Sequence, residues 1–422
     1  MRRGGLRATA VALAVIAVPA AMGAAGARPG SIPPPTPVPP NGEPSPFVTE
    51  LSTPAAATAR PQIAMGSAIL ADLDSGQVLF HQVQDQRRPI ASVTKIMTAL
   101  LVLERADLDE VTTVRPEAMF PADQAGLSTL GLVPGERIAV RDLLYALLLA
   151  SANDAAIALA EQVSGSEARF EAAMNARARE LGMDDTRFRS SNGLDDEGFS
   201  SARDLVTLTR AAYLTQPEFG RIAATQFRDI PSPAGPPRTV QNRNVLLWLY
   251  PGAFGVKTGY TARAGFCVVA AAQRDGRRLV AVILGHAGEP FSDAAALLNY
   301  GFAAFTRQRF VDEGEDVGTV SLPGGTVTVR TGGGLEALVP ISSVGTVTRT
   351  IAVTAGVAFP PAPGEQVATL EVAIPGSHLG SVPLVAADIP PPPPVSPDGP
   401  WWERAAGSVV RAVSGTIRAA IE

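Results

Sequence analysis

The sequence predicts an α/β protein with a mixed core over residues 63–306, a small antiparallel β domain over 311–387 and a C-terminal amphipathic helix over 401–422. Three observations lead to this prediction. Strand-like stretches stand at both ends of the first region, with helical patterns between them. In the second region, apolar residues alternate with Thr or charged residues and glycines interrupt the pattern. Proline-rich runs at 28–62 and 388–400 cannot bury a core and are interpreted as linkers.

The composition is that of a globular protein with enough apolar residues for a large core. Of the 422 residues, 46% are hydrophobic and 18% are charged, and the formal net charge is −5. This length predicts two or three domains. A nucleic-acid partner is excluded, because no dense stripe of Lys and Arg is present. The single cysteine, Cys267, excludes a disulfide within the chain. The three histidines lie far apart in the sequence, so we expect no zinc site, and no cofactor is predicted.

The N-terminus has the layout of a secretory signal over residues 1–27. Arginines come first, an apolar stretch follows, and small residues stand at Ala25 and Ala27 in an A-x-A arrangement. The alternative is an uncleaved membrane anchor, since the apolar span approaches the ~20 residues that cross a bilayer. Pro19 and the weakly hydrophobic alanines favour cleavage. In both cases the body of the protein is exported, to the outer face of the cell membrane or to the periplasm.

The core elements follow from local patterns. Two short strands flank an Asp-Ser-Gly turn at 74–76 and are expected to form a hairpin. Helical patterns dominate residues 92–166, where a polar break at 151–154 separates two apolar runs. The next helix ends in Leu-Gly at 181–182, a typical helix stop. The remaining elements are three strands and a last helix, with the sequences FGVKTGYT, FCVVAAAQR, RLVAVILGH and SDAAALLNYGFAAF.

The C-terminal part carries no chemistry of its own in the sequence. The β domain has no histidine–acid pair and no cysteine cluster. In the tail, Arg404, Arg411 and Arg418 recur every seven residues opposite an apolar face, and paired tryptophans stand at its start. Such a helix suits a membrane interface. The alternative is a helix that packs on the protein itself.

Ser92 and Lys95 stand three residues apart in a mostly apolar segment, PIASVTKIMTAL. On a helix these two positions share a face. A serine nucleophile needs a base within hydrogen-bond reach, and lysine can be that base only when burial or a second cation destabilises its ammonium. The start of a helix would also direct backbone N–H groups at an oxyanion. Alone, the pair is a weak signal, because Ser-x-x-Lys occurs often by chance.

Two further motifs follow in order. Ser151 and Asn153 lie in the break between the apolar helices, where a hydroxyl and a carboxamide can both face a cleft. The alternative is N-capping of the next helix by Asn153 or Asp154. Lys-Thr-Gly at 257–259 lies in a strand-like run, where an edge strand could bind a carboxylate and the glycine would let a substrate backbone approach. The alternative for this tripeptide is a solvated strand end.

Together, Ser-x-x-Lys, Ser-x-Asn and Lys-Thr-Gly form the motif set of penicillin-recognising serine enzymes, and the chain resembles that group. Within it, the chain is most similar to the D-alanyl-D-alanine carboxypeptidases, the low-molecular-mass penicillin-binding proteins of peptidase family S11. The segments FEAAMNARARELGMDDTRF and SSNGLDDEGFSSARDLVTLTR also resemble that family. The similarity covers about 63–306, and the β domain and tail resemble the family's C-terminal domain and membrane anchor. The resemblance implies a β-lactamase/transpeptidase-like domain, an antiparallel sheet flanked by helices.

The resemblance implies a set of catalytic roles. Ser92 attacks the peptide carbonyl between two terminal D-alanines of a peptidoglycan stem peptide and becomes an acyl-enzyme. Lys95 accepts the proton of Ser92, and Ser151 relays a proton toward the leaving amine or toward Lys257. Asn153 orients the substrate amide and Lys95. Water then releases the product, and β-lactams are expected as covalent inhibitors.

The resemblance also implies how substrate is bound. Lys257 and Thr258 hold the terminal carboxylate, and the charge of Lys257 helps to keep the amine of the catalytic lysine neutral. Gly259 leaves room for the substrate backbone. The oxyanion lies between the backbone N–H groups of Ser92 and Tyr260. Some members carry histidine at the Tyr260 position, which we expect to tune the site, because the backbone N–H is the group that matters.

Three other functions stay open at this point. A serine β-lactamase would need a deacylating carboxylate, for which Glu171 and Asn175 are the candidates. A DD-endopeptidase would cut cross-links with the same residues as the carboxypeptidase. A non-catalytic wall-binding scaffold would use the β domain, and the intact motifs argue against it.

Overall fold

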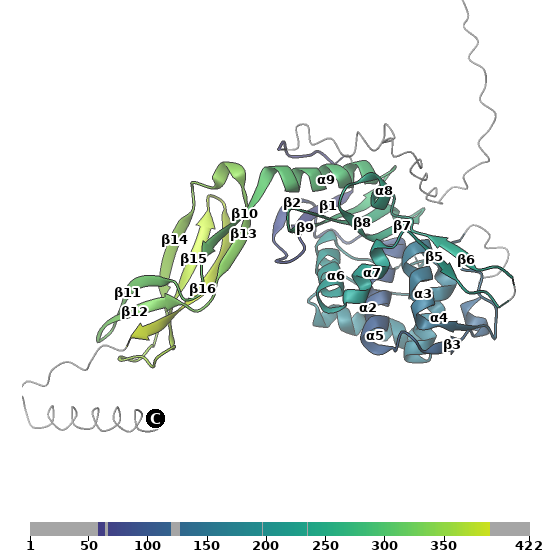
Figure 1. Ribbon diagram of the computed structural model, residues 1–422, viewed down its shortest axis with the longest axis horizontal. Helices are drawn as coiled ribbons and strands as arrows, with labels where there is room; N and C mark the ends of the chain where they lie inside the picture. Colours follow the sequence, from purple (N-terminus) through teal and green to yellow (C-terminus); the bar gives the residue numbers. More distant parts are fainter. Residues whose placement is uncertain (1–57, 64–65, 120–126, 196, 234, 389–422) are drawn as a thin grey trace, which may run out of the picture.

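The computed structural model describes residues 58–63, 66–119, 127–195, 197–233 and 235–388 (Figure 1). The predicted signal segment, most of both proline-rich runs and the predicted C-terminal helix lie outside the described residues. Among the described residues, no helix is both long and apolar enough to span a bilayer.

The centre of the α/β part is an antiparallel sheet, in which the described residues contribute five strands in the order β2-β1-β9-β8-β7. The predicted hairpin is present, because β1 pairs with β2 across the Asp-Ser-Gly turn. The other side of β1 pairs with β9, so the first and last strands of this part lie together. The strands are β1 (Ser67–Asp72), β2 (Val78–Gln82), β7 (Ala253–Thr261), β8 (Gly265–Arg274) and β9 (Arg277–His286).

Helices fill the sequence between β2 and β7, and one more follows β9. Two of them begin at serine caps: the Ser166 side chain accepts from the Arg169 N–H, and the Ser201 side chain accepts from the Asp204 N–H. The helices and helical turns are η1 (Ala91–Thr94), α2 (Lys95–Arg105), η2 (Pro116–Ala118), α3 (Val140–Tyr145), η4 (Ala146–Ala150), α4 (Asn153–Ser164), α5 (Glu167–Glu180), α6 (Ala202–Thr215), α7 (Pro217–Ala224), α8 (Leu246–Leu249) and α9 (Phe291–Ala304).

The sheet is covered on both faces, because its side chains alternate between two cores (Figure 1). On β1, Ile69 and Ala71 pack in the core shared with α2, α6 and α7. Ala68 and Leu70 point the other way and pack with α8 and α9. This alternation is the two-residue period of a strand. The predicted fold class, an antiparallel sheet flanked by helices, is confirmed.

Several elements differ from the sequence prediction. The region 92–166 is not only helical, since it also holds the short antiparallel pair β3 (Val111–Thr113) and β4 (Arg137–Ala139). A second pair, β5 (Phe227–Ile230) and β6 (Arg238–Gln241), precedes β7. These strands have three or four residues, too few for a clear alternating pattern.

The C-terminal part is built from antiparallel strands in two sheets around a separate core (Figure 1). Among the described residues, one sheet has the order β11-β12-β16-β15-β14, and the other pairs β10 with β13. β10 begins at Phe305, directly after α9. The elements are β10 (Phe305–Val311), β11 (Asp316–Leu322), β12 (Gly325–Thr331), β13 (Leu335–Pro340), η5 (Ile341–Ser343), β14 (Thr348–Val353), β15 (Gln366–Ile374) and β16 (Ser377–Asp388).

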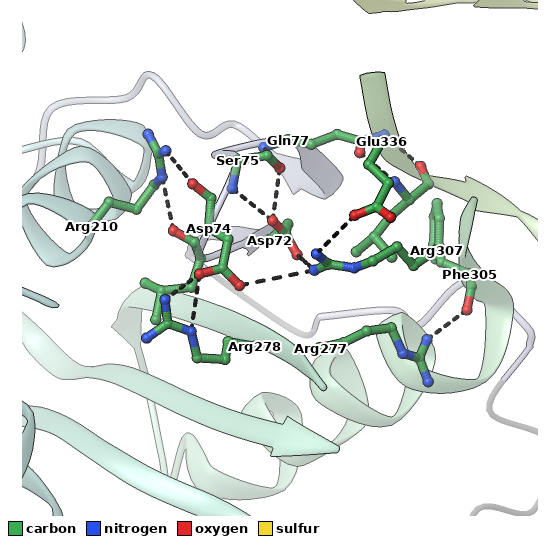
Figure 2. Close-up of polar contacts among 12 residues, drawn as sticks. Asp72, Asp74, Ser75, Gln77, Arg210, Arg277, Arg278, Phe305, Arg307 and Glu336 are labelled. Carbon is green, nitrogen blue, oxygen red and sulfur yellow. Dashed lines mark hydrogen bonds and ion pairs between the residues drawn. The ribbon is translucent and has the colours of Figure 1, made fainter. Parts of the chain in front are cut away.

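The turn after β1 joins the two parts of the chain (Figure 2). The side-chain amide of Gln77 donates to the Leu338 carbonyl on β13 at 2.6 Å and accepts from the Leu338 N–H at 2.9 Å. Arg307 on β10 lies 3.2 Å from the buried carboxylate of Asp72 and 3.9 Å from that of Asp74. The Gln77 side chain of the α/β part therefore binds both backbone groups of Leu338 on β13, as a residue of a neighbouring strand would.

Apolar packing and a second arginine add to this junction. Phe305 and Leu338 are buried in the same core as α8 and α9. Arg277 at the start of β9 donates to the Phe305 carbonyl at 2.7 Å (Figure 2). The first strands of the β part are thus attached to the α/β part by both apolar burial and satisfied backbone groups.

Candidate active site

Ser92 lies in the 3₁₀ turn that leads into α2. The preceding residue, Ala91, has a left-handed φ of +48°, which is uncommon for a residue with a side chain. This turn places the half-buried Ser92 one turn before the helix proper, and Lys95 is the first residue of that helix. The 2.9 Å between Lys95 Nζ and Ser92 Oγ places the two side chains on one face, as their spacing predicts.

Lys95 has no exposed surface, and its amine is surrounded by oxygens. Nζ donates to Asn153 Oδ1 at 2.7 Å and to the backbone carbonyl of Asn192 at 2.6 Å, in addition to its contact with Ser92 Oγ. A carbonyl and an amide oxygen can only accept hydrogen bonds, whereas a hydroxyl can also donate. The three partners therefore fit a neutral amine, which donates two hydrogens and has one lone pair left.

Burial and neighbouring cations favour that neutral form. Burial lowers the pKa of Lys95 well below its usual value, and the charges of Lys257 and Arg243 lower it further, while Asp154 acts in the opposite direction. The pKa of Lys257 is itself lowered to about 7 by burial and by Arg243. An ammonium in this position would be desolvated and would face two other cations.

Ser151 and Asn153 lie at the junction between the wide turn η4 and α4. Ser151 is 4% exposed and has a left-handed φ of +62°, and among the described residues no hydrogen bond engages its hydroxyl. The helix resumes at Asn153, so the break is shorter than the predicted 151–154. Asn153 Oδ1 accepts from Lys95, and no side chain of the described residues caps α4. Ala152 occupies the N-cap position, so the interpretation of Asn153 or Asp154 as the N-cap is wrong, although Asp154 Oδ1 accepts from the Ala155 N–H at 2.9 Å in the first turn.

Asp154 has a role that the sequence did not reveal. Its buried carboxylate accepts the backbone N–H groups of Leu130, Gly131 and Leu132 at 2.9 to 3.1 Å. Next to it, the Asn153 N–H donates to the Ser128 carbonyl at 2.7 Å. These hydrogen bonds hold the start of α4 against a loop that lies more than twenty residues earlier in the chain. The carboxylate of Asp154 is also an anion within electrostatic reach of Lys95.

The Lys-Thr-Gly motif lies on β7, which is an edge strand of the sheet in the described part of the chain, as the sequence predicts. Lys257 and Thr258 are buried, and Lys257 Nζ donates to the Thr258 carbonyl at 2.9 Å. A Cβ on Gly259 would come within 3.0 Å of the Ser92 backbone nitrogen and of the Ile90 carbonyl. Glycine is therefore needed for β7 to pass this close to the serine turn.

The next residue on β7, Tyr260, is half-buried, and its ring packs on the Phe266 ring of β8 with centroids 4.5 Å apart. The structure thus brings the three predicted motifs together: Lys95 contacts Ser92 and Asn153, and β7 runs past Ser92. Sequence reasoning missed Asn192 and Arg243. The Asn-Gly pair at 192–193 marks a turn, but nothing in the sequence shows that its carbonyl faces Lys95. Arg243 donates to the Ala150 carbonyl at 3.1 Å, and burial lowers its pKa.

The candidate residues for a β-lactamase are engaged elsewhere. Asn175 binds the backbone of Phe188 through both its Nδ2 and its Oδ1. Glu171 lies 3.6 Å from Arg189. Among the described residues, no group of three His, Cys, Asp or Glu side chains gathers as a metal site requires. The expectation that the protein needs no cofactor stays a prediction.

Comparison with known proteins identifies the family. A family model described as D-alanyl-D-alanine carboxypeptidase matches residues 54–288. The chain belongs to the D-alanyl-D-alanine carboxypeptidase family. It is 33% identical over 263 residues to the D-alanyl-D-alanine carboxypeptidase DacF of Bacillus subtilis (strain 168), which covers 61% of this chain and 67% of that relative.

Two other relatives extend the comparison. A D-alanyl-D-alanine endopeptidase of Escherichia coli (strain K12) is 35% identical over 252 residues, covering 58% of this chain and 80% of that protein. The crystal structure of penicillin binding protein 6B from Escherichia coli is similar with a TM-score of 0.64 and 29% identity, covering 79% of this chain and 99% of that one. The similarity to a solved structure therefore extends beyond the peptidase region into the β part.

The carboxypeptidase is a serine-type peptidase that acts on D-Ala-D-Ala peptides of the cell wall, as the sequence predicts. Its fold is that of the penicillin-binding proteins, which fits the binding of β-lactams. As a cell-wall enzyme it acts outside the cytoplasm.

Replacing Asp154 with Asn separates its electrostatic effect from its effect on the loop. The negative charge of Asp154 raises the pKa of Lys95, so its loss should keep Lys95 neutral to lower pH. We expect the acid limb of kcat/KM for D-alanine release from D-Ala-D-Ala peptides to move to lower pH. The free energy of unfolding should fall by about 1–3 kcal/mol, because the hydrogen bonds of the carboxylate to the loop are weakened.

The matched control is Asp195→Asn. Asp195 also accepts hydrogen bonds within a loop, from Ser190 and the Gly198 N–H, but it is not among the charges that shift the pKa of Lys95. The control should lose stability without moving the acid limb. An acid limb of Asp154→Asn that stays in place, or that moves to higher pH, would contradict this account.

Proposed function

We propose that Ser92 is the nucleophile of the carboxypeptidase and that Lys95 is its general base. The observation that carries this proposal is the set of oxygens around Lys95 Nζ. Two of them can only accept, so a neutral amine would direct its lone pair at Ser92 Oγ, 2.9 Å away. The hydroxyl can then lose its proton along an existing hydrogen bond as it attacks.

The backbone N–H groups of Ser92 and Tyr260 are the proposed oxyanion site. The close approach of β7 to the Ser92 backbone, which Gly259 permits, supports this role. The Ser92 N–H lies in the turn before α2 and the Tyr260 N–H lies on β7. The two groups can bind the same oxygen only if the turn and the strand are held in a fixed position relative to each other. The helix that follows Ser92 adds its positive dipole end on the same side.

Lys257 and Thr258 are the proposed site for the terminal carboxylate of the substrate. Both lie on the strand that passes Ser92, and Arg243 adds a third positive charge near the two lysines. A bound carboxylate would stabilise the charged form of Lys257 and raise its pKa, because an opposite charge at short range favours ionisation. This placement would set the penultimate peptide carbonyl against Ser92.

The reaction then proceeds in two halves. Ser92 Oγ adds to the carbonyl carbon of the penultimate D-alanine, its proton passes to Lys95, and the negative charge collects on the carbonyl oxygen. The C–N bond breaks as the proton held by Lys95 passes through the Ser151 hydroxyl to the nitrogen of the terminal D-alanine, which leaves Lys95 neutral again, and Asn153 holds the substrate amide. Water next adds to the ester carbonyl and loses a proton to Lys95, and the bond from the carbonyl carbon to Ser92 Oγ breaks as Lys95 returns that proton to Ser92 Oγ. β-Lactams would acylate the same oxygen.

A DD-endopeptidase activity at the same site is the second candidate, favoured by the similarity to the endopeptidase of Escherichia coli. Both reactions cleave after a D-alanine, and they differ in whether the leaving amine belongs to a single D-alanine or to a cross-linked stem peptide. The proposed residues would serve both.

Ser92→Ala tests the nucleophile. We expect covalent labelling by a fluorescent penicillin to disappear and D-alanine release from a D-Ala-D-Ala peptide to fall by roughly 10⁴-fold or more, because the covalent route is lost. Ser343→Ala, in a helical turn of the β part, is the control and should keep both activities.

Retained labelling of a folded Ser92→Ala variant would refute the assignment. A wild-type protein that is labelled by penicillin, releases no D-alanine and cleaves cross-linked muropeptides would favour the endopeptidase.

The pH dependence tests the carboxylate site. Lys257 is cationic below its pKa of about 7 and neutral above it, so it can attract a carboxylate only at the lower pH. We expect kcat/KM for D-Ala-D-Ala peptides to fall as the pH rises through about 7 in the free enzyme. In Lys257→Arg the guanidinium stays charged, and the alkaline fall should move to higher pH. An alkaline limb at the same pH in both proteins would contradict this role for Lys257.

We also propose that the peptidase domain spans 63–306, that the β domain spans 311–387, and that a cleavable signal at 1–27 directs export. The helix at 401–422 would then hold the enzyme at the outer face of the membrane, connected by the proline-rich run at 388–400. The arginine spacing and the paired tryptophans of this segment support the assignment.

Deleting residues 400–422 tests the membrane contact. We expect the protein to move from the membrane fraction to the soluble fraction, because the apolar face and the arginines that bind anionic lipid are lost. Replacing Arg404, Arg411 and Arg418 with Glu should have the same effect, since the charge is reversed while the apolar face remains. An unchanged distribution in both variants would indicate that the N-terminal segment is the anchor.

A further inference from the structure

The carbonyl group that binds Lys95 belongs to a turn. Lys95 Nζ donates to the Asn192 carbonyl at 2.6 Å, the shortest of its three contacts. Asn192 lies between α5 and α6, where the described residues form neither a helix nor a strand, apart from two isolated bridges. Regular backbone pairing therefore does not fix the direction of this carbonyl, and other contacts must hold it.

The preceding residue, Ser191, has no exposed surface and is held by two helices. Its carbonyl accepts from Thr98 Oγ1 of α2 at 2.5 Å. Thr98 lies three residues after Lys95, so the two side chains share a helix face and bind successive carbonyls of the turn. Glu167 Oε1, at the first residue of α5, accepts from the Ser191 hydroxyl at 2.8 Å and from its N–H at 3.2 Å. Side chains of α2 and α5 thus bind all three polar groups of Ser191.

The following residue, Gly193, packs against the turn that carries the serine nucleophile. Gly193 has a left-handed φ of +77°, and a Cβ at this position would overlap the Ala91 carbonyl oxygen. Inside the turn, Asn192 Oδ1 accepts from the Leu194 N–H at 2.9 Å. The Asn192 carbonyl is therefore held from both sides, by the contacts of Ser191 before it and by the packing of Gly193 after it.

Within this set of contacts, Glu167 is the ionisable group, and it lies away from the reacting atoms. Hydrogen bonds to a carboxylate are roughly twice as strong as those between neutral groups. Glu167 is half-buried, and it is not among the charges that shift the pKa of Lys95. Its effect on the amine should therefore pass through the position of the turn and not through its charge.

We propose that Glu167 is a positioning residue of the carboxypeptidase, which holds the Asn192 carbonyl against Lys95 through its two hydrogen bonds to Ser191. This inference rests on the proposed role of Lys95 as the general base. A neutral amine has two hydrogens, and the oxygens that accept them decide where its lone pair points. If the Asn192 carbonyl moved away, the amine could rotate and its lone pair would leave Ser92 Oγ.

The alternative role of Glu167 is to stabilise α5 alone. An acidic residue in the first turn of a helix interacts favourably with the helix dipole. That role depends on the negative charge, whereas the proposed role depends on an acceptor oxygen at the same place. Glutamine keeps the oxygen and loses the charge, so the two roles predict different results for Glu167→Gln.

Kinetics of D-alanine release by the full chain separate the two roles. We expect kcat of Glu167→Ala to fall by about 10- to 100-fold, since a misplacement of about 1 Å in a site can cost about 10²-fold. Lys95 takes a proton in both halves of the proposed reaction, so both halves should slow together and KM should stay within about twofold. Glu167→Gln should retain most of the wild-type kcat, because its amide oxygen can accept both hydrogen bonds.

The matched control is Glu171→Ala. Glu171 lies one turn later on the same face of α5 and contacts Arg189 of the same loop at 3.6 Å, but it does not bind the backbone of Ser191. The control should keep the wild-type kcat. Ser191→Ala is a second test that leaves every charge in place. It removes one of the two hydrogen bonds to Glu167, so its kcat should fall less than that of Glu167→Ala.

Nuclear magnetic resonance reads the amine directly, because the sequence holds only two lysines, Lys95 and Lys257. Protein made with ¹³C-labelled lysine should give two side-chain Cε signals, and Lys257→Arg assigns the signal of Lys95. We expect Glu167→Ala to move the Lys95 signal, while Glu167→Gln and Glu171→Ala leave it in place. A loss of helix stability alone would not move this signal in the folded protein.

An unchanged kcat, or an unchanged Lys95 signal, in a folded Glu167→Ala variant would overturn the inference. Equal losses of kcat in Glu167→Ala and Glu167→Gln would also overturn it, because they would assign the effect to the charge on α5. The proposed general base fails on a different result, a wild-type Lys95 signal that stays that of an ammonium throughout the active pH range. In that case, a Lys95 signal that Glu167→Ala displaces would still support the positioning contact.

Discussion

The active site depends on one buried amine. Lys95 has no exposed surface, and an ammonium there would lose its hydration while two other cations lie nearby. The fold offsets this by placing three oxygens around Nζ and an anion, Asp154, within electrostatic reach. The neutral amine satisfies its hydrogen bonds in this environment and keeps the one property a general base requires, a free lone pair. A better-solvated lysine would be charged and could not serve as the base that we propose for Ser92.

That environment is assembled from four separate segments of the chain. The 3₁₀ turn before α2 brings Ser92 and Lys95, the start of α4 brings Asn153, the Asn-Gly turn brings a backbone carbonyl, and β7 lies alongside. Two non-glycine residues, Ala91 and Ser151, are held in left-handed conformations at the points where these segments meet. Such conformations are costly and persist only where surrounding contacts hold them. Here those contacts include the hydrophobic core of α2 and α4 and the loop bound by Asp154.

The β part is attached through a junction in which side chains bind strand backbone groups. The Gln77 amide replaces the hydrogen-bond partners that β13 would otherwise find in a neighbouring strand, while Arg307 neutralises the buried carboxylate of Asp72. Polar contacts of this kind fix an orientation as well as a distance, because each requires a particular geometry.

The sequence by itself determined the fold class, the hairpin around residues 74–76 and the chemistry, because these depend on local periodicity and on motifs with fixed spacing. Ser92 and Lys95 are one helical turn apart, so their contact follows from helix geometry alone. Only the tertiary structure decided that Asn192 offers its carbonyl to Lys95, that Asp154 binds the backbone of a distant loop, and that Arg243 adds a third cation. These contacts join residues far apart in the chain. Their partners are chosen by packing, and no local pattern records which distant groups the folded chain brings together.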